Sequence, residues 1–159
     1  MAVPEKGALA PDFELPRDGG GSVRLSSLRG KPVVLYFYPK DDTSGCTVEA
    51  VDFSTRKPDF EALGATILGV SPDSVKKHDK FKCKHELTID LLSDTEKDVI
   101  QAYGLWVEKS MYGRKYMGVE RSTFLIDAEG VIAEAWVKVK IPGHVDAVLE
   151  SLKKLVQPA

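Results

Sequence analysis

The sequence predicts a single α/β domain in which helices flank a central mixed sheet. Two continuous apolar runs, residues 33–38 and 66–70, are typical of strands that are buried on both faces of a parallel sheet. A helical segment at about 46–63 separates them, which makes a strand–helix–strand unit. A strand, turn and strand over residues 123–133 and a final helix from about Val145 then close the domain.

The first half of the chain also predicts a hairpin and a second helix. Polar and apolar residues alternate at 12–15 and 23–25 around a glycine turn, which indicates an N-terminal β-hairpin. Pro58 lies inside the first helix and is expected to kink or split it. Ser71, followed by a proline, is expected to cap a second helix that ends at about His85.

Two further elements follow before the final helix. Residues 89–92 form a short apolar strand, and the capping box Ser93-Asp94-Thr95-Glu96 predicts a helix that runs to about Tyr103. Helical spacing in the final helix places six apolar side chains on one face. These are Val145, Val148, Leu149, Leu152, Leu155 and Val156.

Composition bounds the class of protein. The length of 159 residues suits one domain over residues 1–159, and hydrophobic residues make up 43% of it. A net charge of −2 argues against nucleic acid or a membrane surface as the main partner. No run approaches the roughly 20 apolar residues that span a bilayer. The N-terminus lacks the apolar region of a signal peptide.

The two cysteines, Cys46 and Cys83, are too few for a secreted disulfide framework. They suit a reducing compartment, so we expect a cytoplasmic protein or an organellar form whose targeting segment has been removed. The cysteines and the three histidines show none of the short spacings that bind structural zinc. The thiols are therefore interpreted as reactive.

Cys46 is the candidate nucleophile. It follows a buried strand and a polar turn, at the beginning of a helix whose free N–H groups and positive dipole end favour a thiolate. The hydroxyl of Thr43, three residues earlier, can face the sulfur, and Pro39 gives the turn a rigid apolar wall. Arg121, at the start of the 123–126 strand, offers a cation with a planar fork of donors. These groups are those that a peroxide-reducing thiol needs.

Each of these residues also has a simpler interpretation. Cys46 could be a small buried apolar side chain. Thr43 could be an ordinary helix cap. Arg121 could form a surface ion pair with Glu120 or Asp127. The histidines, His78, His85 and His144, are interpreted as structural or solvated, with His144 at the entrance to the final helix.

The order Pro39-x-x-x-Thr43-x-x-Cys46 resembles the PxxxTxxC signature of peroxiredoxins. Residues 37–47 resemble the PrxQ, or bacterioferritin comigratory protein, subfamily. Further blocks match this subfamily in the same order, so that the resemblance covers about residues 5–156. They are Gly69–Ser74, Leu91–Asp94, Tyr103–Trp106 and Glu120–Ile126.

This resemblance implies a thioredoxin-like fold and a thiol-dependent peroxidase that reduces hydrogen peroxide and organic hydroperoxides in antioxidant defence. Cys46 would be the peroxidatic cysteine and would become a sulfenic acid. Thr43 and Arg121 would orient the peroxide, Pro39 would shield the sulfenate, and Glu49 would hold the arginine. The resemblance implies no metal, haem or flavin cofactor, a dithiol reductant such as thioredoxin, and a monomer.

The sequence departs from the subfamily at two positions. Ser44 stands where proline is common, and Val51 stands where many members carry the resolving cysteine. Cys83 is the remaining candidate, because some members place this thiol on the next helix. The helical phase predicts that Cys83 is accessible, near Lys76, Lys80, Lys82 and Lys84. The alternative is a stray surface thiol, with resolution by an external thiol.

A disulfide needs Cα atoms within about 7 Å, so pairing of Cys46 with Cys83 predicts that the first turn at Cys46 and part of the 73–85 helix unwind on oxidation. Two other functions stay open. A disulfide reductase would normally carry Cys-x-x-Cys, and the second position here is Glu49. A non-catalytic interaction module would not need the Pro39, Thr43 and Cys46 set.

Overall fold

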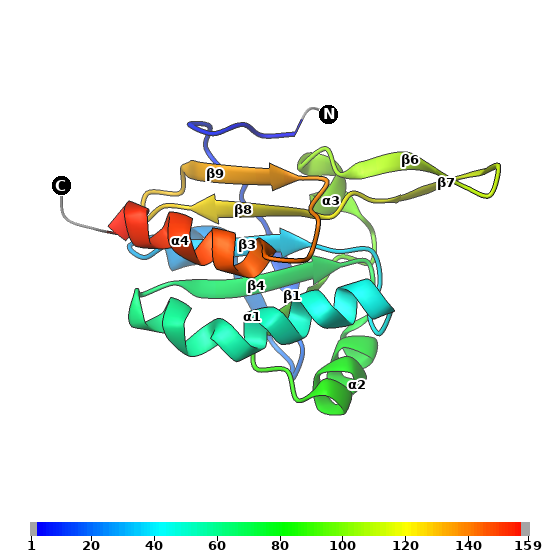
Figure 1. Ribbon diagram of the computed structural model, residues 1–159, viewed down its shortest axis with the longest axis horizontal. Coiled ribbons are helices and arrows are strands. Elements are labelled where there is room, and N and C mark those ends of the chain that lie inside the picture. Colours follow the sequence, from blue (N-terminus) through cyan, green and yellow to red (C-terminus); the bar gives the residue numbers. More distant parts are fainter. Residues whose placement is uncertain (1–2, 157–159) are drawn as a thin grey trace.

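The computed structural model describes residues 3–156 and contains a five-stranded sheet in the order β5-β4-β3-β8-β9. Helices α1 and α4 lie together on one face of this sheet (Figure 1). The sheet strands are β3 (Val33–Phe37), β4 (Thr66–Ser71), β5 (Asp90–Ser93), β8 (Ser122–Ile126) and β9 (Ile132–Val137). The helices are α1 (Ser44–Ala62), α2 (Val75–His85), α3 (Asp98–Ala102) and α4 (His144–Val156), with a 3-10 turn at Leu25–Leu28.

The central strand, β3, joins the parallel and antiparallel halves of the sheet. It pairs in parallel with β4 and antiparallel with β8, and all five of its residues are buried. β4 also pairs in parallel with β5. This arrangement confirms the predicted mixed sheet and the strand–helix–strand unit. The continuous apolar sequence of β3 suits a strand that is covered on both faces.

Apolar side chains fill both faces of the sheet. On the face covered by α1 and α4, Tyr36 of β3 and Tyr38, just after the strand, pack with Phe53 of α1 and Leu149 of α4. The opposite face holds Leu35 and Phe37 of β3 with the N-terminal segment and the region of α3, including Tyr103. The side-chain alternation of a strand produces this division. Four of the six apolar residues predicted for the final helix are buried, whereas Val156 is 36% exposed.

The N-terminal hairpin is confirmed, but both predicted caps are wrong. β1 (Glu14–Pro16) pairs antiparallel with β2 (Ser22–Arg24). Ser71 is the last residue of β4, and Ser74 instead caps α2 by accepting the Lys77 N–H at 3.3 Å. The pleated register of β4 with β5 extends as far as Ser71 and Ser93, so these serines remain in the sheet.

The helix predicted from Ser93 begins later and is shorter. α3 covers only Asp98–Ala102, and Lys97 precedes it with a left-handed backbone. Asp94, rather than Ser93, supplies the side-chain acceptor, because its carboxylate accepts the Ile100 N–H at 2.8 Å. One acidic side chain thus replaces the predicted capping box.

Pro58 does not split α1, which continues from residue 44 to 62. Proline leaves the carbonyl four residues earlier without its helical donor. That carbonyl belongs to Ser54, and the Thr88 hydroxyl donates to it at 3.3 Å. The Ser54 hydroxyl in turn accepts the Thr88 N–H at 3.0 Å. The segment before β5 therefore satisfies the group that the proline leaves free.

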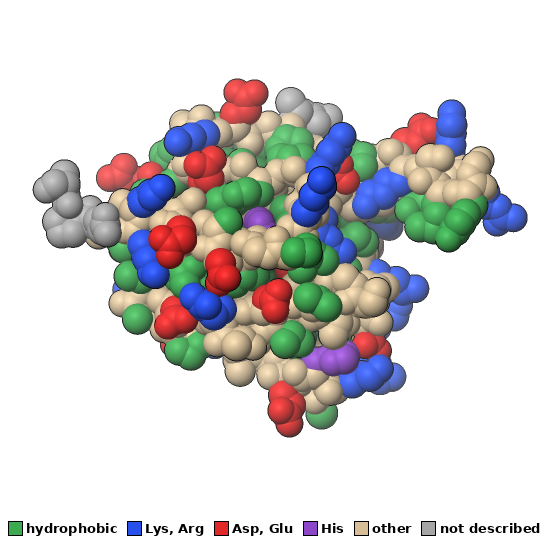
Figure 2. Space-filling view, in the orientation of Figure 1, with side chains coloured by type: hydrophobic (Ala, Val, Ile, Leu, Met, Phe, Trp, Pro, Cys, Tyr) green, Lys and Arg blue, Asp and Glu red, His purple; other side chains and the backbone are tan. Residues whose placement is uncertain are grey.

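A second hairpin, which the sequence pattern does not predict, projects from the domain. β6 (Trp106–Met111) and β7 (Arg114–Val119) pair along their whole length. Figure 2 shows apolar and basic side chains together on this projection. Its exposed apolar residues are Met111, Tyr112, Tyr116 and Met117. Among residues 3–156, no helix combines the length and apolar character needed to cross a membrane.

Candidate active site

Cys46 lies in the first turn of α1 and is almost completely buried, at 1% exposure. Thr43 is the N-cap residue and has an extended backbone. Because the first regular bond joins the Thr47 N–H to the Thr43 carbonyl, the N–H of Cys46 is among the free donors of the helix end. The predicted position of the thiol at a positive helix terminus is therefore found.

Arg121 reaches this thiol from a distant part of the chain. It immediately precedes β8, and the antiparallel register sets Ser122 opposite Phe37, the last residue of β3. The chain between Phe37 and Cys46 therefore lies beside Arg121. Its Nη2 donates to the Cys46 Sγ at 3.2 Å, and its Nη1 donates to the Glu49 Oε1 at 2.8 Å. A surface ion pair of Arg121 with Glu120 or Asp127 is not what the structure forms.

Glu49 lies three residues after Cys46, on the same side of α1. Burial raises the pKa of its carboxyl from 4.5 to about 7, and the attraction of Arg121 offsets only part of this effect. Within residues 3–156, the Glu49 Oε2 has no hydrogen-bond partner. For Arg121, burial alone would lower the pKa, but the adjacent Cys46 and Glu49 outweigh this effect, and the net shift of the pKa is upward. The guanidinium therefore faces two acidic groups.

Replacement of Glu49 by glutamine is expected to change how stability depends on pH. A carboxyl whose folded pKa is raised stabilises the fold most below its ordinary pKa, and this contribution is lost as pH rises through the folded pKa. The wild type should therefore lose stability relative to Glu49→Gln between about pH 4.5 and 7, by on the order of 3 kcal/mol. Urea unfolding of both proteins at several pH values measures this difference, and parallel curves would contradict it.

Thr43 and Pro39 lie in the loop before α1, but the Thr43 hydroxyl does not face the Cys46 sulfur as the sequence predicts. The Thr43 hydroxyl donates to the Lys40 carbonyl at 3.0 Å, and its side chain is exposed. This bond turns the loop rather than capping the helix. Pro39 is half-buried at the start of the same loop. A Cβ atom on Gly45 would lie 3.2 Å from Ile141 and 3.4 Å from the Arg121 guanidinium, so the backbone approaches the cation closely.

The site also contains residues that sequence reasoning did not assign to it. Tyr36 is buried beside Cys46 and Glu49, and burial raises the pKa of its hydroxyl. His144 begins α4, as expected, but also interacts with Arg121. Burial, reinforced by this cation, lowers the His144 pKa to about 4, and its Nε2 lies 2.8 Å from the Thr123 hydroxyl. The strand pattern around Tyr36 indicates only core packing.

Cys83 is not part of this cluster. It lies near the end of α2 and is exposed, as the helical phase predicts, whereas Cys46 is buried. Both thiols are free. Two of the lysines expected near Cys83 form ion pairs with other residues: Lys82 binds Asp18 and Lys84 binds Asp42, at 2.8 and 2.7 Å respectively.

A buried thiol at a helix N-terminus, held by a guanidinium, agrees with the peroxiredoxin resemblance. Residues 7–135 match the AhpC/TSA family. The chain belongs to this family. It is 52% identical over 151 residues to Peroxiredoxin Bcp of Bacillus subtilis, an alignment that covers 95% of this chain and 96% of that protein.

Solved structures agree with this AhpC/TSA assignment. A Xylella fastidiosa PrxQ cysteine-to-serine mutant has a TM-score of 0.93 and 40% identity, and the match covers 99% of this chain and 100% of that one. A second match is to Xanthomonas campestris Bacterioferritin Comigratory Protein, in a study of its alkyl peroxide reduction activity. It has a TM-score of 0.89 and 45% identity and covers 99% of this chain and 100% of that one. The thioredoxin-like peroxiredoxin fold is thereby confirmed, and the chain is a thiol peroxidase.

Proposed function

We propose that Cys46 is the peroxidatic cysteine of this peroxidase. The observation that carries this assignment is the 3.2 Å contact between the Arg121 guanidinium and the Cys46 Sγ, at the positive end of α1. Cys46 as thiolate attacks one oxygen of a hydroperoxide, and the O–O bond breaks. The sulfur becomes a sulfenic acid, and the other oxygen leaves as an alcohol or water after it takes a proton.

The surrounding groups have separate roles in this step. Negative charge develops on the leaving oxygen, and Arg121 together with the free N–H of Cys46 supplies fixed donors near it. Thr43 orients the peroxide once its hydroxyl turns from the Lys40 carbonyl toward the sulfur. Pro39 forms the wall that shields the sulfenate. Glu49 holds the guanidinium through the 2.8 Å bond and is a positioning residue.

Cys83 is proposed as the resolving thiol. Its sulfur attacks the Cys46 sulfur, an S–S bond forms, the S–O bond breaks, and hydroxide leaves and becomes water. Two observations support this route over resolution by a cysteine in the first helix. Cys83 is exposed, and position 51, where many members carry that cysteine, is valine. Because Cys46 is buried, the first turn of α1 and part of α2 must open for the sulfurs to meet.

The disulfide then needs a dithiol reductant, and a thioredoxin suits an exposed Cys83. The substrates proposed are hydrogen peroxide and alkyl hydroperoxides, the latter supported by the alkyl peroxide reduction activity of the Xanthomonas campestris relative. We propose a monomer in the cytoplasm that acts in antioxidant defence and redox homeostasis. The competing route is a one-cysteine cycle in which an external thiol reduces the sulfenic acid.

Peptide mapping without reductant, after one equivalent of hydrogen peroxide, tests the resolution step. We expect a single intramolecular disulfide between Cys46 and Cys83. The Cys83→Ser variant should keep the first turnover and lose cycling driven by thioredoxin, because its sulfenic acid lacks an internal partner. A lasting sulfenic acid in the wild type, with Cys83 still open to alkylation, would instead establish the external-thiol route.

A further inference from the structure

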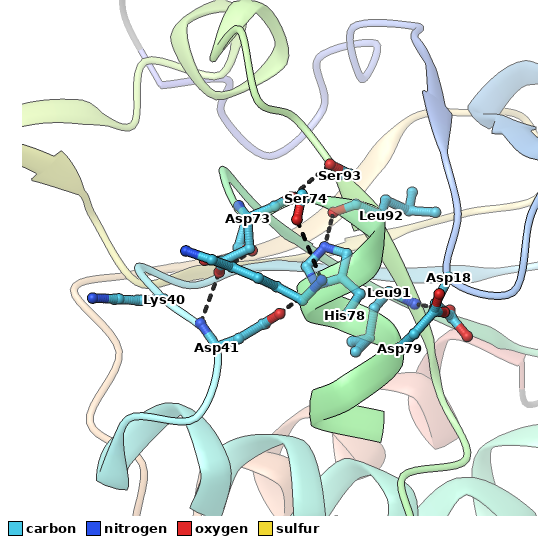
Figure 3. Close-up of polar contacts among 12 residues, drawn as sticks. Asp18, Lys40, Asp41, Asp73, Ser74, His78, Asp79, Leu91, Leu92 and Ser93 are labelled. Atoms are coloured by element: carbon cyan, nitrogen blue, oxygen red, sulfur yellow. Dashed lines mark hydrogen bonds and ion pairs between the residues drawn. The ribbon is translucent and has the colours of Figure 1, made fainter. Parts of the chain in front are cut away.

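A buried cluster connects the loop that precedes Cys46 to helix α2. Figure 3 shows Asp41, from this loop, pointing toward His78 of α2. One carboxylate oxygen of Asp41 accepts the Tyr38 hydroxyl at 2.6 Å, and the other lies 2.6 Å from the His78 Nδ1. Asp41 is 8% exposed and His78 is 0% exposed, so the contact is largely shielded from solvent.

The second nitrogen of His78 shows where one ring hydrogen lies. The His78 Nε2 lies 2.8 Å from the Leu92 carbonyl of β5, which can only accept, so this nitrogen carries a hydrogen. A 2.6 Å contact between two acceptors would be repulsive, so a second proton lies between the His78 Nδ1 and the Asp41 carboxyl group. Burial lowers the His78 pKa, but the bonds to Asp41 and Leu92 and the nearby charge of Asp73 outweigh it and raise the pKa. The ring is thus held between the loop and the sheet.

Two further contacts join the same segments. The Asp41 backbone N–H donates to the Asp73 carboxylate, just before α2, at 2.7 Å. The next residue, Asp42, faces outward and binds Lys84 and His85 of α2 at 2.7 and 2.8 Å. Consecutive loop residues thus hold α2 from inside and outside. Loss of one partner should cost more at the buried pair than at the exposed contacts of Asp42, because it leaves a buried charge unpaired.

We propose that the Asp41–His78 pair, together with the Tyr38 hydroxyl, is a latch that holds α2 against the loop before Cys46 and sets how often this region opens. Asp41 lies five residues before Cys46, and His78 lies five residues before Cys83. An unwinding that brings the two sulfurs together must separate them. This proposal rests on the proposed resolution by Cys83, and its residues are positioning residues rather than catalytic ones.

The latch determines the fate of the sulfenic acid. In the closed state, a second hydroperoxide can oxidise the Cys46 sulfenic acid to a sulfinic acid, with the hydroperoxide reduced to an alcohol or water. In the open state, Cys83 displaces hydroxide and forms the disulfide instead. A weaker latch should therefore favour the disulfide, and a stronger one should favour over-oxidation.

The His78→Phe variant tests this directly. Phenylalanine keeps a ring in the site but offers no donor, so the Asp41 carboxylate loses its cation and the closed state is destabilised. Solvent hydrates Asp41 in the open state, so opening becomes easier. We expect disulfide formation to accelerate about tenfold after a single peroxide pulse, and the sulfinic fraction to fall in proportion. The rate of sulfenic acid formation should stay within about twofold, because the Arg121 contacts are unchanged.

Matched variants separate the latch from general destabilisation. Ile132→Ala weakens the core at β9, which lies at the opposite edge of the sheet from β5. At an equal loss of urea midpoint it should leave the disulfide rate unchanged. The double variant Asp41→Asn with His78→Phe removes the uncompensated charge and should return the rate toward the wild type. Tyr38→Phe, a milder change, should accelerate the disulfide about threefold and serves if His78→Phe does not fold.

Amide exchange and disulfide rates together decide whether the latch exists. Amide exchange should rise at residues 39–46 and 75–85 in the latch variants and not in β9. Equal disulfide rates in the wild type and the latch variants, or equal acceleration by Ile132→Ala, would overturn the latch and leave resolution by Cys83 intact. If the wild type forms no Cys46–Cys83 disulfide, the proposed resolution itself fails and the latch fails with it.

Discussion

The Cys46→Ser variant is expected to lose at least about 10³-fold of its hydrogen peroxide consumption, because serine keeps the shape of the nucleophile but not its ionisation. The serine hydroxyl is slightly smaller than the thiol and fits the same buried position beside Arg121, so the fold should persist. Peroxide decay with dithiothreitol as the electron source measures the loss, and far-ultraviolet circular dichroism checks the fold.

Cys83→Ser is the matched control for this change, since it replaces the other thiol in the same way. With dithiothreitol, it should still consume peroxide, because a small external thiol can reduce the Cys46 sulfenic acid. Undiminished consumption by Cys46→Ser would remove Cys46 from the chemistry. Equal losses in both variants would show that the two thiols cannot be assigned separate steps.

Replacement of Arg121 by glutamine is expected to slow oxidation of Cys46 by hydrogen peroxide by about 10²–10³-fold, the usual effect of removing one donor at a developing charge. Arg121→Lys should lie between this variant and the wild type. A lysine keeps the charge but cannot match the planar fork that holds Cys46 and Glu49 together at 3.2 and 2.8 Å. Stopped-flow oxidation of the reduced protein measures the second-order rate constant directly.

The Arg24→Gln variant is the control for the Arg121→Gln prediction. Arg24 lies on β2, is more than half exposed and pairs with Glu14 on the surface. The same chemical change there should leave the rate constant unaltered. If Arg121→Gln were oxidised as fast as the wild type, the guanidinium would be a structural partner of Glu49 and no part of the peroxide site.

The sequence predicts those features that local patterns encode. Strands buried on both faces, such as β3, stand out as continuous apolar runs, and the turn before Cys46 carries residues of distinctive chemistry. The meeting of Arg121 with Cys46, 75 positions apart, was anticipated through the chemistry that the thiol needs and the family resemblance. No local periodicity contains that information, because the β3–β8 register creates it.

The features that were missed depend on partners distant in the sequence. The sequence predicts a structural His78, which its burial supports, but its partner Asp41 lies 37 positions away and no local pattern indicates their contact. The β6–β7 hairpin has largely exposed residues on both faces and so lacks the alternation that marks a half-buried strand. The sequence predicts that Pro58 interrupts α1. It does not show that the Thr88 hydroxyl satisfies the carbonyl that the proline leaves free, because this bond is a tertiary contact.

The separation of Arg121 from Cys46 along the chain has a consequence for how the enzyme is made. A ribosome releases α1 with its nucleophile about seventy residues before it releases the guanidinium, at a synthesis rate of roughly 5–20 residues per second. During that interval the nascent polypeptide holds Cys46 without the Arg121 guanidinium. The cation that contacts Cys46 thus arrives only when β8 docks beside β3, so completion of the sheet and completion of the site are one event.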